Sequence, residues 1–375
     1  MAKNSFDIQM MAHAMSLAQR GEGWVNPNPL VGAVIVRDGK IIAEGWHARY
    51  GELHAERNAF RNADASGVDC TDATMYVTLE PCCHHGHQPP CTEAIIGHKI
   101  RRVVVGLRDP NPLVAGKGMN QLREAGIDAE YLDDEETDAM LRKQNRIFLK
   151  YITTGMPWVT AKWAMTLDGK IASASGDSRW VSSPESRKVV HLMRSRHLAI
   201  MCGIGTVLAD DPMLNVRLDD EKEAYRQPIR IVADHHLRIP LDCQLVRSAR
   251  EIPVIVVAGA NASNADELSK EPVLEEYGVQ VWHCSSNQEM MERIGKEKID
   301  SVLLEGGGIL NESLLRDGLI DEVCSFIAPK IIGGAGALSP VGGKGIMKMG
   351  DAVRLDDISV ANVGTDILVS GTVIK

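Results

Sequence analysis

The chain has 375 residues, 44% hydrophobic and 24% charged, with a net charge of −9, a composition that excludes disordered and collagen-like chains. At about 150 residues per domain, its length predicts two domains. No run of Lys and Arg exceeds two residues and both halves are net negative, so small molecules are better candidate partners than nucleic acid.

The first half alternates helical and strand-like segments. Residues 4–20 lack the continuous apolar core of a signal peptide, and Ile8, Met11 and Met15 recur at helical spacing. Apolar runs flank Asp38-Gly39, a pattern typical of a β-hairpin with a type I′ turn. The later alternation predicts a mostly parallel sheet. We expect helices from near His54 and Cys91 and over 118–125 and 133–151, and strands over 74–79, 101–106 and 129–132.

Turn-forming residues cluster at 153–157, so we expect domains over 1–150 and 151–375. The second half alternates again, which predicts two unlike α/β domains. No apolar run approaches the ~18 residues of a membrane span, and no membrane partner is expected. The expected strands of the second half cover 158–165, 199–202, 229–233, 254–258, 279–283 and 301–304.

The eight cysteines are unevenly distributed. Four lie between Cys70 and Cys91, and the others stand singly in apolar stretches. Secreted disulfide scaffolds have dense, regularly spaced cysteines, and this chain does not. The cysteine distribution therefore favours a location in the reducing cytoplasm. A cysteine cluster in that compartment indicates metal binding or catalysis.

His54-Ala55-Glu56, followed by Pro81-Cys82 and then Cys91, resembles the signature of cytidine deaminase-like zinc enzymes. One imidazole and two thiolates would leave the fourth position of a tetrahedral zinc ion for water. Glu56 is the candidate catalytic residue, shuttling a proton to the departing amine. The spacing departs from the common Pro-Cys-x-x-Cys, and several ligand sets are conceivable on chemistry alone. The competing donors are Cys83, His84, His85 and His87.

The text Thr78-Leu79-Glu80-Pro81-Cys82, followed by His84-His85-Gly86 and Pro89-Pro90-Cys91, is similar to the riboflavin-pathway pyrimidine deaminase family. That resemblance implies zinc bound by His54, Cys82 and Cys91. The run from Asn26 to Gly32 resembles the substrate-edge loop of the family. It makes Asn26, together with His47, a candidate for substrate binding.

In the second half, five segments follow in the order found in the reductase domain of the same family, which is similar in fold to dihydrofolate reductase. They are 162–172, 175–180, Arg194, 203–214 and 305–308. Glycines after the 301–304 strand would let backbone N–H groups approach a pyrophosphate, and arginine suits a substrate phosphate. The resemblance implies an NADPH site at Ala164, Trp180, Thr206, Asp210, Gly307 and Gly308. It implies a substrate site at Ser178, Arg194, Leu214, Arg217 and Glu305.

The sequence thus predicts a bifunctional α/β enzyme: a zinc-dependent cytidine deaminase-like domain followed by an NADPH-dependent, dihydrofolate reductase-like domain. The expected reactions deaminate 2,5-diamino-6-(5-phosphoribosylamino)pyrimidin-4(3H)-one and then reduce its ribosyl side chain, giving 5-amino-6-(5-phosphoribitylamino)uracil. The family also implies a homodimer. Two alternatives stay open: a cytidine/adenosine-type deaminase with an accessory C-terminal domain, and a zinc-stabilised binding module.

Overall fold

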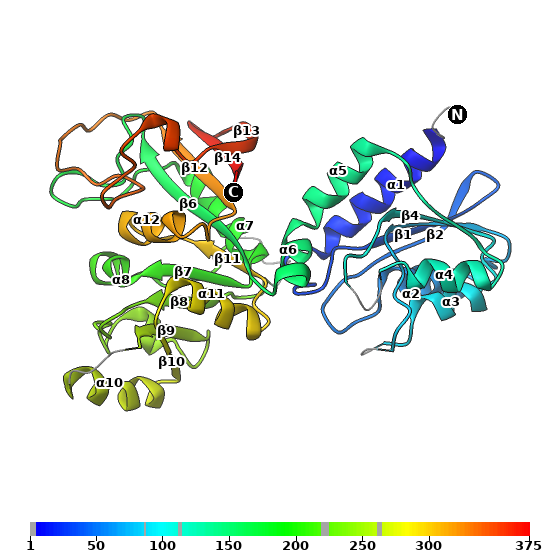
Figure 1. Ribbon diagram of the computed structural model, residues 1–375, viewed down its shortest axis with the longest axis horizontal. Helices are drawn as coiled ribbons and strands as arrows, with labels where there is room; N and C mark the ends of the chain where they lie inside the picture. The colour runs from blue at the N-terminus through cyan, green and yellow to red at the C-terminus, as the bar shows by residue number, and fades with distance from the viewer. Residues whose placement is uncertain (1–4, 86–87, 112–114, 219–224, 261–264) are drawn as a thin grey trace. The chain divides into compact units, whose positions relative to one another are not determined.

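The computed structural model describes residues 5–85, 88–111, 115–218, 225–260 and 265–375. The chain forms two compact units, residues 1–155 and 156–375, each with its own sheet and core (Figure 1).

The N-terminal unit is built on a five-stranded sheet with the order β2-β1-β3-β4-β5. Asp38 and Gly39 both have positive φ (51° and 73°), so the expected hairpin turn is confirmed. β1 is antiparallel to β2 and β3, whereas β3, β4 and β5 are parallel. The strands are β1 (Gly32–Arg37), β2 (Lys40–Trp46), β3 (Thr74–Leu79), β4 (Arg102–Leu107) and β5 (Asp128–Tyr131). The helices are α1 (Ser5–Ala18), α2 (Ala55–Ala65), α3 (Cys91–Gly97), α4 (Lys117–Glu124), α5 (Glu135–Gln144) and α6 (Arg146–Thr154), with a 3₁₀ turn at Gln19–Gly21.

The single helix expected over 133–151 is wrong, because the segment forms α5 and α6 with Asn145 between them. The Asn145 side chain is buried and pairs with the backbone of Leu30. Its Oδ1 accepts from Leu30 N at 2.8 Å, and its Nδ2 donates to Leu30 O at 3.0 Å. This long-range pairing sets the break between the helices and ties the end of the unit to the loop before β1.

Gly45 in β2 lets α2 lie unusually close to the sheet. A Cβ at this position would fall 2.3 Å from Ala59 N and 2.6 Å from Ala55 O, both backbone atoms of α2. Only a glycine therefore permits this approach. The contact fixes the first turn of α2, which carries His54 and Glu56.

A buried polar network connects helix α1 to strands β3 and β4 of the same sheet. Asp7 is 4% exposed; it accepts a 2.5 Å hydrogen bond from the Tyr76 hydroxyl and a two-pronged ion pair from Arg102, with N–O distances of 3.0 and 2.8 Å. Burial and the hydrogen bond to Asp7 raise the pKa of Tyr76 well above its usual range. The phenol therefore stays protonated and acts as the donor.

We expect Asp7→Ala to lower the free energy of unfolding by ~2–3 kcal/mol. The substitution removes the hydrogen-bond acceptor of the Tyr76 hydroxyl and one of the two carboxylates that pair with Arg102. The loss is smaller than for a fully buried pair because Arg102 is 24% exposed and also contacts Glu130. Urea unfolding followed by circular dichroism measures it, with the exposed Glu124→Ala as control. Equal midpoints for the two variants would contradict the expectation.

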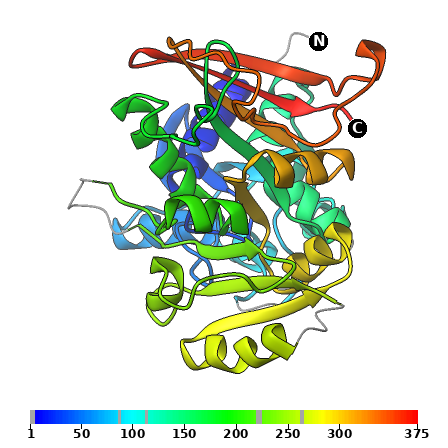
Figure 2. The ribbon, with the colours of Figure 1, turned by 90° about the vertical axis from the view of Figure 1, so that its left-hand side faces the viewer.

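The C-terminal unit contains a nine-stranded sheet, order β10-β9-β8-β7-β11-β6-β12-β14-β13. In Figure 2, where this unit faces the viewer, the last two strands in the chain are red. The first seven are parallel, as expected, and β14 and β13 are antiparallel. The strands are β6 (Trp158–Thr166), β7 (Ala199–Gly203), β8 (Ile229–Ala233), β9 (Val254–Gly259), β10 (Val279–Cys284), β11 (Ser301–Leu304), β12 (Glu322–Ala328), β13 (Leu355–Val363) and β14 (Asp366–Val373). The helices are α7 (Pro184–Arg196), α8 (Ile204–Asp210), α9 (Gln244–Arg247), α10 (Ala265–Glu276), α11 (Asn287–Lys296) and α12 (Gly308–Arg316), with a 3₁₀ turn at Met349–Asp351.

Strands β12, β13 and β14 were not predicted from the sequence. β13 lies at the sheet edge and is exposed along almost its whole length, so no alternation of buried and exposed residues marks it. Pairing with β14 rather than side-chain burial holds it in place.

Candidate active sites

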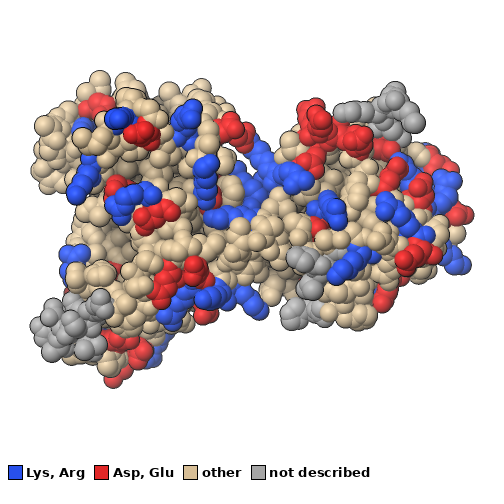
Figure 3. Space-filling model, in the orientation of Figure 1, with Lys and Arg blue, Asp and Glu red and all other residues tan. Residues whose placement is uncertain are grey.

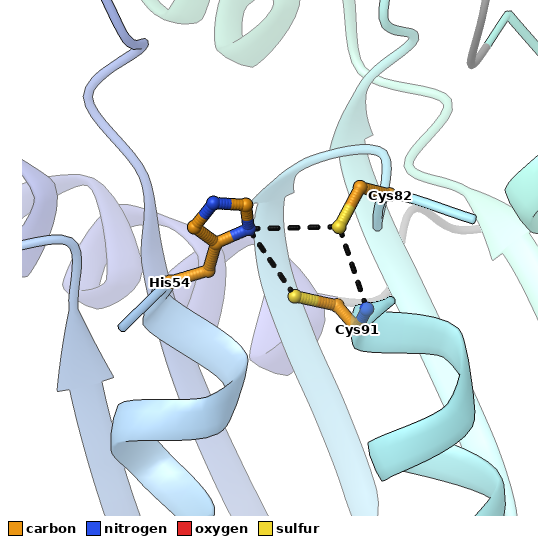
Figure 4. A group of neighbouring side chains, drawn as sticks. All are labelled: His54, Cys82 and Cys91. Atoms are coloured by element: carbon orange, nitrogen blue, oxygen red, sulfur yellow. Dashed lines mark hydrogen bonds between the residues drawn. The ribbon is translucent and has the colours of Figure 1, made fainter. Parts of the chain in front are cut away.

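Three elements bring His54, Cys82 and Cys91 together in the N-terminal unit (Figure 4). His54 is the residue before α2, Cys82 follows β3, and Cys91 is the first residue of α3. His54 Nδ1 lies 3.5 Å from the Sγ atoms of both cysteines, and all three donor atoms lie within 4.8 Å of one another. The backbone N–H of Cys91 also donates to Cys82 Sγ at 3.4 Å.

The two thiols differ in charge. Hydrogen bonds from the Cys91 thiol and from His54 lower the pKa of Cys82 to about 4. The adjacent Cys82 and complete burial raise the pKa of Cys91 well above its usual range. The hydrogen bond to Cys82 raises the pKa of His54. The three donors therefore share protons within a compact site, and a bound cation would displace those protons.

This donor set suits zinc. One imidazole and two thiolates are ligands that zinc prefers, and three protein ligands leave a fourth tetrahedral position free. The converging donors do not include Cys83, His84 or His85, and His87 lies outside the described residues. Glu56 is 3% exposed beside this group, and burial followed by the charge of Cys82 raises its pKa.

His47 lies next to the metal-binding group, with its ring centroid 5.4 Å from that of His54. It is 2% exposed, and burial lowers its pKa, so the imidazole is neutral. His47 Nδ1 lies 3.0 Å from Leu53 O, and Nε2 lies 3.1 Å from the Asn28 amide nitrogen. Nδ1 is therefore the protonated nitrogen. Asn26 is half-buried in the same loop, at a cis peptide bond to Pro27.

In the C-terminal unit, Glu305 directly follows β11, at the edge where the parallel strands end. Its carboxylate takes a two-pronged ion pair from Arg194 of α7 (2.6 and 3.0 Å) and a third contact from Lys162 of β6 (2.8 Å). Burial alone would raise the pKa of Glu305, but the two cations outweigh it and hold the pKa well below its usual range. Arg194 also donates to Asn215 O at 2.9 Å, so it links Glu305 to the segment before Arg217.

The other residues implied by the resemblance lie around the same strand ends. Gly307 precedes α12, and a Cβ there would lie 3.9 Å from Thr206 Oγ1 of α8. Ser178 Oγ lies 3.5 Å from Asp210 Oδ1. Trp180 is 65% exposed, and its carbonyl accepts from Lys330 at 2.6 Å.

Four residues implied by the resemblance remain: Leu214, Arg217, Ala164 and Gly308. Leu214 is buried with positive φ (45°), and Arg217 hydrogen-bonds the Asn215 side chain. Ala164 lies in β6 opposite Phe326 of β12. Gly308 starts α12, and a Cβ there would fall 2.7 Å from Ser339 O, so the turn admits no side chain.

Two titratable residues at these sites, Lys162 and His191, were not singled out from the sequence. Lys162 lies two residues before Ala164 in β6, and that period-2 spacing places both on one face of the strand, a signal that could have identified it. His191 of α7 accepts from Arg217 N at 3.2 Å. Burial and the neighbouring Arg194 and Arg217 lower the pKa of His191 to about 4, so it is neutral. No sequence pattern marks His191, because its partners lie on another segment.

A His/Cys/Cys centre beside a buried glutamate, and a separate α/β unit with an ionic cluster and a glycine turn at its parallel strand ends, indicate a zinc-dependent deaminase joined to a reductase. Residues 4–107 match the cytidine and deoxycytidylate deaminase zinc-binding region, and residues 157–369 match the RibD C-terminal domain. The chain belongs to the RibD family of riboflavin biosynthesis proteins.

Full-length relatives support this assignment. The chain is 46% identical over 380 residues to the riboflavin biosynthesis protein RibD of Actinobacillus pleuropneumoniae, covering 100% of this chain and 97% of the relative. It is 40% identical over 372 residues to RibD of Escherichia coli strain K12, covering 96% and 98%. Among solved structures, a crystal form of Acinetobacter baumannii RibD superposes with a TM-score of 0.87 at 36% identity, covering 99% of each chain.

The chain is therefore a bifunctional deaminase and reductase of riboflavin biosynthesis, with hydrolase and oxidoreductase activities. The expected order of a deaminase-like domain and a reductase domain is confirmed. The deaminase domain is zinc-binding, and the domain that follows it matches the RibD C-terminal domain. Neither an accessory C-terminal domain nor a plain zinc-stabilised module accounts for the match over 157–369. No helix within the described residues is both long and apolar enough to cross a membrane.

Proposed function

We propose that the deaminase domain, over residues 1–150, acts on 2,5-diamino-6-(5-phosphoribosylamino)pyrimidin-4(3H)-one. A Thermotoga maritima protein that is 34% identical, with a TM-score of 0.84, is described as a diaminohydroxyphosphoribosylaminopyrimidine deaminase and 5-amino-6-(5-phosphoribosylamino)uracil reductase. The observation that carries the proposal is the convergence of His54 Nδ1 and the Cys82 and Cys91 sulfurs beside buried Glu56.

In this proposal His54, Cys82 and Cys91 hold zinc, which when bound lowers the pKa of a water to about 7. Glu56 accepts a proton from the attacking water and delivers it to the leaving amine, so that ammonia departs. Its burial favours this role, because a pKa raised above the ordinary carboxyl value makes the carboxylate a better proton acceptor. Asn26 and His47 line the pyrimidine pocket, with Asn28 fixing the tautomer of His47.

The reductase domain, over residues 151–375, is proposed to reduce the ribosyl group of the deaminated product to ribityl. NADPH supplies the hydride when bound. Gly307 and Gly308 let its pyrophosphate approach the N-terminus of α12, flanked by Thr206 and Asp210 of α8, while Ala164 and Trp180 complete the cofactor site. Ser178, Leu214 and Arg217 contact the substrate, and Arg194 and Glu305 form the ionic base of its site.

An anaerobic assay of the purified, zinc-loaded protein with the diaminopyrimidine and NADPH tests both halves together. Ammonia should appear first, and NADPH absorbance should fall only after deamination. Ammonia release from cytidine or adenosine instead, with no NADPH consumption, would overturn the substrate assignment.

We also propose that the protein is a cytoplasmic homodimer that pairs through its reductase domain. The supporting feature is the edge strand β13, where Ile358 and Val360 are 53% and 65% exposed. An exposed apolar edge strand favours pairing with another chain. On the face in Figure 3, Lys and Arg are interspersed with Asp and Glu over each unit. Sedimentation equilibrium should give a dimer mass, and Val360→Lys should shift it toward monomer; an unshifted dimer would point to another interface.

A further inference from the structure

Arg57 links the helix that follows His54 to the segment that precedes Cys91. It lies in the first turn of α2, three residues after His54, which places both on one side of the helix. Its Nε donates to Pro89 O at 3.0 Å, and its Nη2 donates to Pro90 O at 2.8 Å. The guanidinium therefore spans the two carbonyls immediately before Cys91.

Arg57 holds Pro89 and Pro90 through the only kind of backbone group that prolines can offer for a hydrogen bond. Pro89 and Pro90 have no N–H groups, so their carbonyls are the backbone groups that can anchor them. Pro90 is buried and precedes α3 directly, so its position sets where Cys91 begins the helix. Cys91 N and Thr92 N both bond Cys82, at Sγ (3.4 Å) and at O (3.2 Å). The two cysteines are thus joined to each other through the main chain, whereas His54 reaches them only through its side chain, at 3.5 Å from each sulfur.

We propose that Arg57 is a positioning residue whose two hydrogen bonds to Pro89 and Pro90 hold Cys91 against the first turn of α2 and thereby set the zinc affinity of the deaminase domain. The inference rests on the proposed ligand set His54, Cys82 and Cys91. Both hydrogen bonds of Arg57 go to the main chain immediately before Cys91, and its effect on the zinc site is transmitted through that main chain.

The test compares Arg57→Met with Arg61→Met, which alters an exposed arginine one turn further along the same helix. Zinc affinity is measured by competition with a chromophoric chelator. Loss of a group that orients a metal ligand typically weakens metal binding ~10- to 100-fold. We expect zinc affinity to fall by this factor in Arg57→Met and to stay unchanged in Arg61→Met. In metal-free protein, Cys91 should also be alkylated faster by iodoacetamide in Arg57→Met, as followed by mass spectrometry.

Arg57→Lys separates geometry from charge, because it keeps the cation but cannot bond both carbonyls in the same planar arrangement. Its zinc affinity should lie close to that of Arg57→Met. Wild-type affinity in Arg57→Lys, or equal losses in Arg57→Met and Arg61→Met, would overturn the proposal. Far-UV circular dichroism confirms that each variant is folded.

The ligand set is tested separately with His54→Ala. Zinc retention by His54→Ala would contradict the proposed centre itself. Zinc loss by His54→Ala with full retention by Arg57→Met would leave the centre intact and contradict only the positioning role.

Discussion

Glu56→Gln should stop ammonia release while leaving hydride transfer intact. The amide keeps the size of the side chain but cannot take up and deliver a proton, and a positioned proton-transfer group contributes ~10²- to 10⁴-fold to a rate. The deaminase rate should fall by that amount. Reduction of pre-deaminated substrate, measured as NADPH oxidation, should be unchanged because the two chemistries use different units of the chain.

The matched control is Glu93→Gln, which changes an exposed carboxylate two residues after Cys91. Its deaminase rate should stay near that of the wild type. Zinc content, measured by atomic emission, should be the same in both variants. Loss of zinc from Glu56→Gln would mean that Glu56 supports the metal rather than the proton transfer, and a parallel loss of NADPH oxidation would argue against independent sites.

Glu305→Gln should have the second large effect, on the reductase. It removes the carboxylate shared by Lys162 and Arg194, whose side chains are 13% and 12% exposed, and leaves two cations close together without their counter-charge. Truncating one partner of a buried, hydrogen-bonded charge pair costs ~2–4 kcal/mol, which corresponds to roughly 30- to 1000-fold in kcat/KM. Steady-state NADPH oxidation measures this loss, and ammonia release should be unaffected.

The same cluster has a defined pH dependence. Because the folded-state pKa of Glu305 is lowered, its ion pairs stabilise the reductase domain fully above the ordinary carboxyl pKa of about 4.3 and lose that contribution only as pH falls through the lowered value. Wild-type protein should therefore keep the contribution at pH 5, whereas Glu305→Gln should be destabilised there as at pH 7. The exposed Glu275→Gln is the control, and equal melting temperatures for Glu305→Gln and this control at pH 7 would contradict the assignment.

Much of the architecture follows from local pattern. The Asp38-Gly39 turn, the short apolar strands and the polar breaks between them predict the hairpin and parallel strands, because these depend on backbone preference and side-chain periodicity. The edge strand β13 escaped prediction because a strand that is held by pairing, with little burial of its side chains, has no periodic signature. The break at Asn145 depends on a partner, Leu30, that is remote in the sequence.

The sequence alone determined which chemistries the chain carries, because the His54/Glu56 and Cys82/Cys91 segments and the reductase segments can be read in order along it. The tertiary structure decided which donors converge: His54, Cys82 and Cys91 meet within 4.8 Å, while Cys83, His84 and His85 lie outside that group. It also decided that Glu305 is shared between Lys162 and Arg194, and that Arg57 holds the segment before Cys91. These relations depend on how strand ends and helix starts meet in space, and contacts between residues far apart in the chain leave no local pattern to read.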